Sequence, residues 1–236
     1  MADKETNQAD AWGKKVELKR SYRFLRAVLH LFTPRINTVW DEPWDGEPCV
    51  FCPNHDRAWG PINMCVWFDG RNHIHPWYNA GVVDRKGLPA YVRNDNWWNP
   101  NSKLAWLWNA TIPHIAAWLM PPIIGCTPGI PVYYDAKVAT TFRQSTDLLK
   151  KGGSMVIFAQ YPDGYESHAE HLSKGFLLIA PLAWKRCGIR LKFYPVHCDQ
   201  KSRTIHVMKP IQFDPERTLP EQEAELLAYL EERVHD

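Results

Sequence analysis

The sequence predicts an α/β protein whose mostly parallel central sheet is flanked by helices. From Gly129 onward, β-rich segments alternate with helical segments, the pattern of strands joined by helical crossovers. Hydrophobic residues make up 45% and charged residues 23% of the 236 residues, as in folded domains. A chain of this length can also bury a sizeable core. We therefore expect a polar tail and helix over residues 1–35, followed by one α/β domain over residues 36–236.

Composition narrows the classes of partner. The chain has 28 Lys and Arg against 26 Asp and Glu, a formal net charge of +2. Because the chain is nearly neutral, it is not a general polyanion binder, and we expect no nucleic acid partner. The 12 Trp residues are typical of a membrane interface or a ligand groove. The first dozen residues are polar and lack the apolar core of a signal peptide, which predicts a cytoplasmic protein with reduced thiols.

Residues 14–32 are predicted to form a basic amphipathic helix. Apolar positions such as Tyr22 and Leu29 alternate with cations such as Lys19 and Arg23, and Pro34 ends the segment. Two interpretations remain open. The helix lies in an anionic lipid surface, or it packs on the domain and leaves a solvated basic side.

A buried strand is predicted over residues 48–53, followed by a polar loop and a helix from Pro61 to about Phe68. Cys49 and Cys52 have the spacing of zinc ligands, and histidines lie nearby. A strand, however, directs residues three apart to opposite faces. We therefore predict buried, unreactive thiols and no metal site. Residues 70–101 are rich in Trp, Asn, Pro and Asp, which predicts irregular structure.

Residues 103–124 form the most apolar stretch of the chain. Asn109, His114 and three prolines interrupt it, which argues against a membrane-spanning helix. We expect a broken helix, packed either at the lipid interface or in the core.

The remaining segments have a regular pattern. Glycines that follow periodic runs, such as Gly152 and Gly188, mark helix ends. The predicted strands are residues 130–134, 154–159, 191–196 and 204–208, and the predicted helices are residues 137–150, 173–187 and 220–234.

Three polar loops follow predicted strands, where ligands gather in open α/β sheets. The first carries Asn54 and His55, the second Tyr134 and Asp135, and the third residues 162–167. If their strands are parallel neighbours, the loops meet at one edge of the sheet. A histidine just past a strand, on a loop that opens a helix, is well placed to act as a general base.

The first loop has the sequence Asn54-His55-Asp56-Arg57-Ala58-Trp59-Gly60. It resembles the first motif of the glycerolipid acyltransferases of the lysophosphatidic acid acyltransferase type, which have Asn-His, four residues and then Asp. The third loop, Pro162-Asp163-Gly164-Tyr165-Glu166-Ser167, loosely resembles the family's Phe-Pro-Glu-Gly-Thr-Arg-Ser motif. Lys174-Gly175 and Phe193-Tyr194-Pro195-Val196 are similar to later family segments. The resemblance covers roughly residues 45–200.

This resemblance implies an acyltransferase of phospholipid biosynthesis, bound peripherally to the inner face of a membrane. In the family, the histidine takes a proton from the acceptor hydroxyl, which attacks an acyl thioester carried by coenzyme A or acyl carrier protein; no cofactor is needed. The implied catalytic residues are His55, Asp56 and Asp163. The implied acceptor-site residues are Asn54, Arg57, Tyr134, Asp135, Pro162, Gly164, Ser167 and Lys174.

The sequence also departs from the family pattern. Gly60 replaces the aspartate that orients the imidazole, so Asp56, Asp135 or Asp163 is needed to replace it. Tyr134 stands at a family arginine, and Tyr165-Glu166 replaces Thr-Arg. Arginine is the preferred clamp for phosphate, so its loss predicts an acceptor other than a simple glycerol phosphate, unless Arg57, Arg143 or Lys174 takes over that role.

A second class of function remains open, a lipid- or acyl-binding protein that kept the fold and lost catalysis. Gly60 favours this interpretation, and the retained Asn54-His55 pair argues against it. Serine hydrolase and phosphate-loop motifs are absent from the sequence. The sequence does not predict an oligomeric state.

Overall fold

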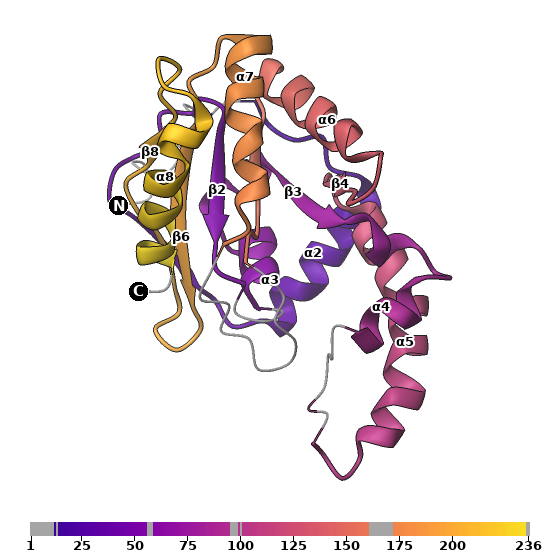
Figure 1. The fold of residues 1–236 in the computed structure, drawn as a ribbon. Coiled ribbons are helices and arrows are strands. Elements are labelled where there is room, and N and C mark those ends of the chain that lie inside the picture. The colour runs from indigo at the N-terminus through magenta and orange to yellow at the C-terminus, as the bar shows by residue number, and fades with distance from the viewer. Residues whose placement is uncertain are drawn as a thin grey trace.

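The structure, a computed structural model, describes residues 12, 14–55, 59–94, 99, 101–160 and 172–234. Within these residues it is an α/β fold around an eight-stranded mixed sheet in the order β1-β7-β6-β2-β5-β3-β4, with β8 also paired to β6 (Figure 1). β6, β2, β5, β3 and β4 run parallel, whereas β7 and β8 run antiparallel to β6. The strands are β1 (Asn37–Trp40), β2 (Cys49–Pro53), β3 (Ile74–Asn79), β4 (Ile130–Val132), β5 (Ser154–Val156), β6 (Lys192–Asp199), β7 (Thr204–Val207) and β8 (Ile211–Gln212).

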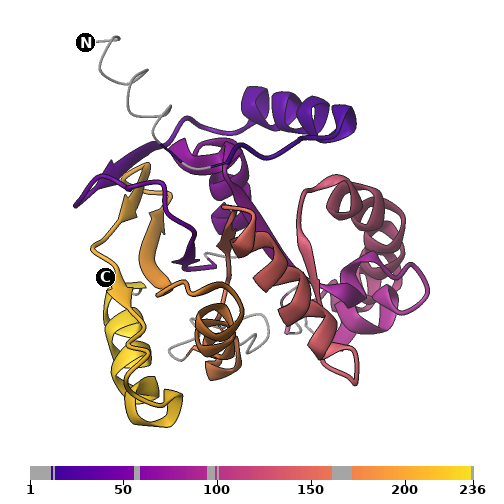
Figure 2. The same cartoon turned by 90° about the horizontal axis from the view of Figure 1, so that it is seen from above.

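Helices cover both faces of the sheet, as the sequence predicted. α2 and α3 lie on one face, and α6, α7 and α8 lie on the other (Figure 2). The α-helices are α2 (Arg20–Phe32), α3 (Trp59–Val66), α4 (Leu88–Asn94), α5 (Ala105–Cys126), α6 (Val138–Lys150), α7 (Ile179–Cys187) and α8 (Leu219–Val234). Short 3-10 helices are η1 (Asp69–Asn72), η2 (Ala80–Val83) and η3 (Lys174–Leu178).

The central strand β2 joins the two halves of the core. All five of its residues are buried. Cys49 and Phe51 pack on the α3 side, and Val50 and Cys52 pack on the α7 and α8 side. The two thiols therefore point to opposite faces, which confirms the predicted alternation. Burial raises the pKa of both thiols far above the ordinary cysteine value, so they are protonated at neutral pH.

The expectation of irregular structure over residues 70–101 was wrong. This stretch contains β3, which lies inside the sheet between β5 and β4. Pro76 is the last β3 residue in register with β5, and Trp77 is the first in register with β4. Because pairing changes sides at this point, β3 accommodates a proline that an ordinary central strand excludes.

The N-terminal helix is shorter than predicted. Residues 14–19 are not helical, and the Val16 N–H donates to the Asn72 carbonyl oxygen at 2.7 Å. This contact ties the segment to η1, and α2 begins only at Arg20. The other predicted elements agree with the structure within a few residues, although η3 forms the first part of the predicted helix over 173–187, and β1 and β8 were not predicted. Gly188, with a φ of 68°, closes α7 as expected.

The expected broken helix is continuous. α5 runs from Ala105 to Cys126 through Pro113, Pro121 and Pro122. Together with α4 and η2 it forms a lobe that extends away from the sheet (Figure 1). The small core of this lobe is centred on Leu88, Val92 and Ala116. No helix in the described parts of the chain has the length and apolar character needed to cross a bilayer.

Candidate functional site at the carboxyl edge of the sheet

His55 lies two residues beyond the carboxyl end of β2 and is exposed. Its ring meets the ring of Phe158 edge-on, with 5.2 Å between the ring centroids. Its backbone N–H donates a hydrogen bond to the side-chain oxygen of Gln160. Phe158 and Gln160 both follow β5, the strand parallel to β2. The residues that directly follow these two neighbouring strands therefore meet at His55, whereas residues 162–167 of the predicted third loop lie outside the described residues.

The third predicted loop leaves and returns beside this histidine. Gln160 and Leu172 form an antiparallel bridge, and the Ser173 N–H donates to the Ala159 carbonyl oxygen at 2.7 Å. These contacts anchor both ends of the loop. Six of the predicted site residues lie outside the described residues, namely Asp56, Arg57, Pro162, Asp163, Gly164 and Ser167.

Asn54 anchors the loop to the sheet. Its side-chain oxygen accepts from the Cys198 N–H at 2.6 Å, and its side-chain nitrogen donates to the Cys198 carbonyl oxygen at 3.0 Å. The carboxamide thus extends the pairing of β2 with β6 by one residue. Because both ends of the amide are bound to the backbone, Asn54 fixes the start of the His55 loop.

Gly60 stands where the acyltransferase motif that this loop resembles has an aspartate, and the structure supplies a steric reason for the glycine. A Cβ atom at residue 60 would lie 2.4 Å from the carbonyl oxygen of His55 and 2.5 Å from that of Asn54. The Gly60 N–H also donates to the His55 carbonyl oxygen at 3.1 Å. The first turn of α3 therefore closes on the loop so tightly that no side chain fits. The missing aspartate is incompatible with this backbone.

The second predicted loop lies at the far end of the sheet. β4 is three strand positions from β2, about 14 Å at the usual spacing between strands. Tyr134 is 82% exposed, and the Asp135 carboxylate accepts from the Lys137 N–H at 2.8 Å where α6 begins. Lys174 is also exposed and pairs with Glu223 of α8 at 3.3 Å. The structure thus brings the residues that follow β2 and β5 together and holds the second loop apart.

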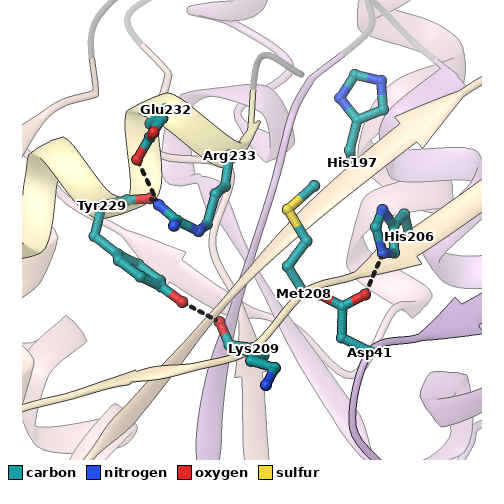
Figure 3. A pocket seen from close by; sticks show the side chains of 8 residues that line it. All are labelled: Asp41, His197, His206, Met208, Lys209, Tyr229, Glu232 and Arg233. Carbon is teal, nitrogen blue, oxygen red and sulfur yellow. Dashed lines mark hydrogen bonds and ion pairs between the residues drawn. The ribbon is translucent and has the colours of Figure 1, made fainter.

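A polar groove of about 440 Å³ lies on the α8 side of the sheet (Figure 3). His206 Nε2 lies 2.6 Å from Asp41 Oδ1, and His197 follows on the neighbouring strand. The other described lining residues bond mainly to one another, with Arg233 3.8 Å above the Tyr229 ring. A histidine base is therefore present, but the described lining has no serine, threonine or cysteine to serve as nucleophile. This favours a structural role for the His206–Asp41 pair.

Two residues at the His55 site were missed by sequence reasoning. Phe158 and Gln160 contact His55, yet nothing in their sequence pattern distinguishes them from the end of an ordinary strand. Among the described residues, no group of three or more potential ligands could hold a metal ion. No model of a known protein family matches the chain, and a search of curated proteins found no similar sequence.

Proposed function

We propose that this protein is a membrane-surface acyltransferase that moves a fatty acyl group from a thioester to a lipid acceptor. The donor is acyl coenzyme A or acyl carrier protein. His55 takes the proton from an acceptor O–H or N–H as that atom attacks the thioester carbonyl carbon. A new ester or amide bond forms, the C–S bond breaks, and the thiolate leaves and takes up a proton.

One observation carries this proposal. The exposed His55 lies at the carboxyl edge of the sheet. There its backbone N–H donates a hydrogen bond to the side chain of Gln160, which follows the neighbouring strand β5. This is the edge at which open α/β sheets bind ligands. Because the Gln160 bond fixes the main chain of His55, the imidazole starts from a defined backbone position. Asp56 and Asp163 remain the proposed orienting carboxylates.

The location that we propose is the cytoplasmic face of a membrane, and exposed apolar side chains support contact with a membrane. On α2, Phe24 and Phe32 are 72% and 82% exposed. On α5, the exposed apolar side chains include Trp106, Ile115 and Trp118, and the helix contains no Asp, Glu, Lys or Arg. Tryptophan suits the boundary between headgroups and acyl chains, where both substrates partition.

The acceptor we propose is a neutral or amine-bearing lipid. Tyr134, which stands where the family has an arginine, projects into solvent far along the sheet from His55. It cannot supply the paired hydrogen bonds with which a guanidinium holds phosphate. A clear preference for lysophosphatidic acid over neutral and amine-bearing acceptors would overturn this part of the proposal.

The test compares His55→Ala with the wild type and with His114→Ala, which removes an exposed histidine of α5. Acyl transfer is followed with both thioester donors and a panel of acceptors in mixed micelles. We expect His55→Ala to lose about 10²–10⁴-fold in rate, the usual contribution of general-base catalysis. His114→Ala should retain the rate. Equal rates in all three proteins would contradict a catalytic role for His55.

The second candidate is an acyl- or lipid-binding protein without catalysis, and the packing at Gly60 favours it. That packing excludes the aspartate with which the family orients its histidine. Wild-type protein that binds acyl thioesters but transfers no acyl group to any acceptor would support this alternative.

A further inference from the structure

A second hollow, also about 440 Å³, lies between α2 and the segment that follows α3. α2 packs beside α3 on the face of the sheet away from α8 (Figure 2). Four basic side chains line the hollow, Arg23, Arg26, His30 and Arg71, together with apolar residues that include Leu31 and Val66. None of the described lining residues is acidic. The hollow therefore concentrates positive charge in a protein whose net charge is only +2.

Neutral groups hold two of these guanidinium groups in place. Arg26 Nη1 donates to the side-chain oxygen of Asn72 at 2.7 Å, and Arg71 Nη1 donates to the Phe68 carbonyl oxygen at 3.0 Å. Within the described part of the chain, neither arginine forms an ion pair with a carboxylate. Each guanidinium carries five N–H donors, so most of their donors are not used by these two bonds.

The electrostatics of the hollow favour an anion. Burial lowers the pKa of Arg71, and the nearby charge of Arg26 lowers it further, against a smaller opposing effect of Asp69. Two like charges are thus held close together and partly out of water. An anion between them would remove this repulsion and gain charge-assisted hydrogen bonds.

We propose that the hollow binds a phosphate group, with Arg26 and Arg71 as its principal ligands and Arg23 at its side. The guanidinium fork matches phosphate oxygens, which makes arginine the usual residue for such sites. His30 stacks on Trp67 with 4.1 Å between ring centroids, which holds its ring at the edge of the hollow. The phosphate belongs to a lipid headgroup or to a small phosphorylated molecule, and Leu31, 80% exposed, offers an apolar contact to the organic part of either.

This phosphate is distinct from the acceptor proposed at His55. Gly60, in the first turn of α3, packs against the His55 loop, and Val66 at the end of α3 lines the hollow. These two residues are about 9 Å apart along the helix axis at about 1.5 Å per residue. The two proposed sites therefore lie at opposite ends of α3, and the two proposals stand or fall separately.

The experiment titrates full-length protein with inorganic phosphate and with glycerol phosphate by calorimetry, and measures cosedimentation with phosphatidylcholine vesicles with or without phosphatidic acid. Arg26→Gln and Arg71→Gln are compared with Arg190→Gln, which removes an exposed arginine near α7. We expect each hollow variant to weaken phosphate binding at least about tenfold, the lower range for a charge-assisted pair. Arg190→Gln should bind as the wild type does.

Thermal unfolding without ligand distinguishes a binding role of Arg26 and Arg71 from a purely structural one, because loss of a structural residue would lower the melting temperature. Because each hollow variant relieves repulsion, we expect its melting temperature to equal or exceed that of the wild type. Binding of the soluble phosphates identifies a small ligand, and selective binding to phosphatidic acid vesicles identifies a headgroup; either supports the site. Wild-type affinity in both hollow variants, equal loss in Arg190→Gln, or no binding by the wild type to any probe would overturn it.

Discussion

The centre of the sheet and the α4–α5 lobe use apolar residues in opposite ways. In β2 every side chain is buried, and helices cover both faces of the sheet around it. In the lobe, one side of α5 packs through Ala116 onto α4, while Ile115 and Trp118 project into solvent. The first region buries its apolar surface in the core, and this packing positions His55 at the end of β2. The second keeps apolar side chains exposed, and this is the surface that we propose contacts a bilayer.

The largest expected effect tests how rigid the first region is. Gly60→Asp places a Cβ 2.4 Å from the His55 carbonyl oxygen, and we expect a loss of about 3 kcal/mol or more in unfolding free energy. Gly125→Ala is the matched change in the lobe, where a Cβ meets no atom within 4 Å. It should raise stability by about 0.5–1 kcal/mol. Urea denaturation measures both, and a stable Gly60→Asp protein would contradict the packing described.

Truncating a buried leucine should destabilise the whole protein when the residue lies in the sheet core, and only the lobe when it lies in the lobe core. Leu177 and Leu88 are both fully buried, the first under the sheet and the second in the lobe. Leu177→Ala should cost about 2–5 kcal/mol of global stability. Leu88→Ala should mainly speed amide hydrogen exchange in α4 and α5 and leave the sheet protected. Equal acceleration of exchange throughout the chain in the Leu88 variant would show that the lobe and sheet unfold as one unit.

The exposed face of the lobe is tested with Trp118→Ser. Because this side chain is 72% exposed, we expect the unfolding free energy to change by less than about 0.5 kcal/mol. Vesicle affinity should fall about tenfold, the effect of losing one inserted aromatic side chain. Trp184→Ser, on α7, is the control and should bind vesicles normally. An unchanged affinity for Trp118→Ser would separate the lobe from membrane binding.

The smallest effect concerns His75, on the β3 strand between the two regions. Its Nδ1 lies 2.6 Å from the Pro128 carbonyl oxygen, and burial lowers its pKa more than this bond raises it. The native state thus favours neutral His75. The stability that this residue contributes is complete above pH 6.5, the pKa of histidine in the unfolded chain. It is lost as the pH falls below 6.5, because the unfolded chain then takes up a proton more readily than the folded one. We expect the melting temperature of His75→Gln to fall slightly less than that of the wild type between pH 7.5 and 5.5. An identical fall in both proteins would refute this.

Local patterns were sufficient for much of the fold. The alternation of strands and helices predicted the α/β class, and the glycine after Cys187 predicted the end of α7. Both depend on neighbours in the chain, namely hydrophobic periodicity and a left-handed backbone conformation. The same reasoning missed β3, because its proline, Pro76, is tolerated at the point where pairing passes from β5 to β4.

By itself, the sequence determined the class of the fold, the opposite orientation of the β2 thiols and the position of His55 at the end of a strand. Only the tertiary structure decided which loops meet there. Strand order placed β5 next to β2 and β4 at the far end, so Gln160 reaches His55 while Tyr134 stays distant. Tertiary packing alone also brought Arg26 and Arg71 to one hollow. Contacts between residues far apart in the chain depend on how elements pack, which periodicity along the chain does not encode.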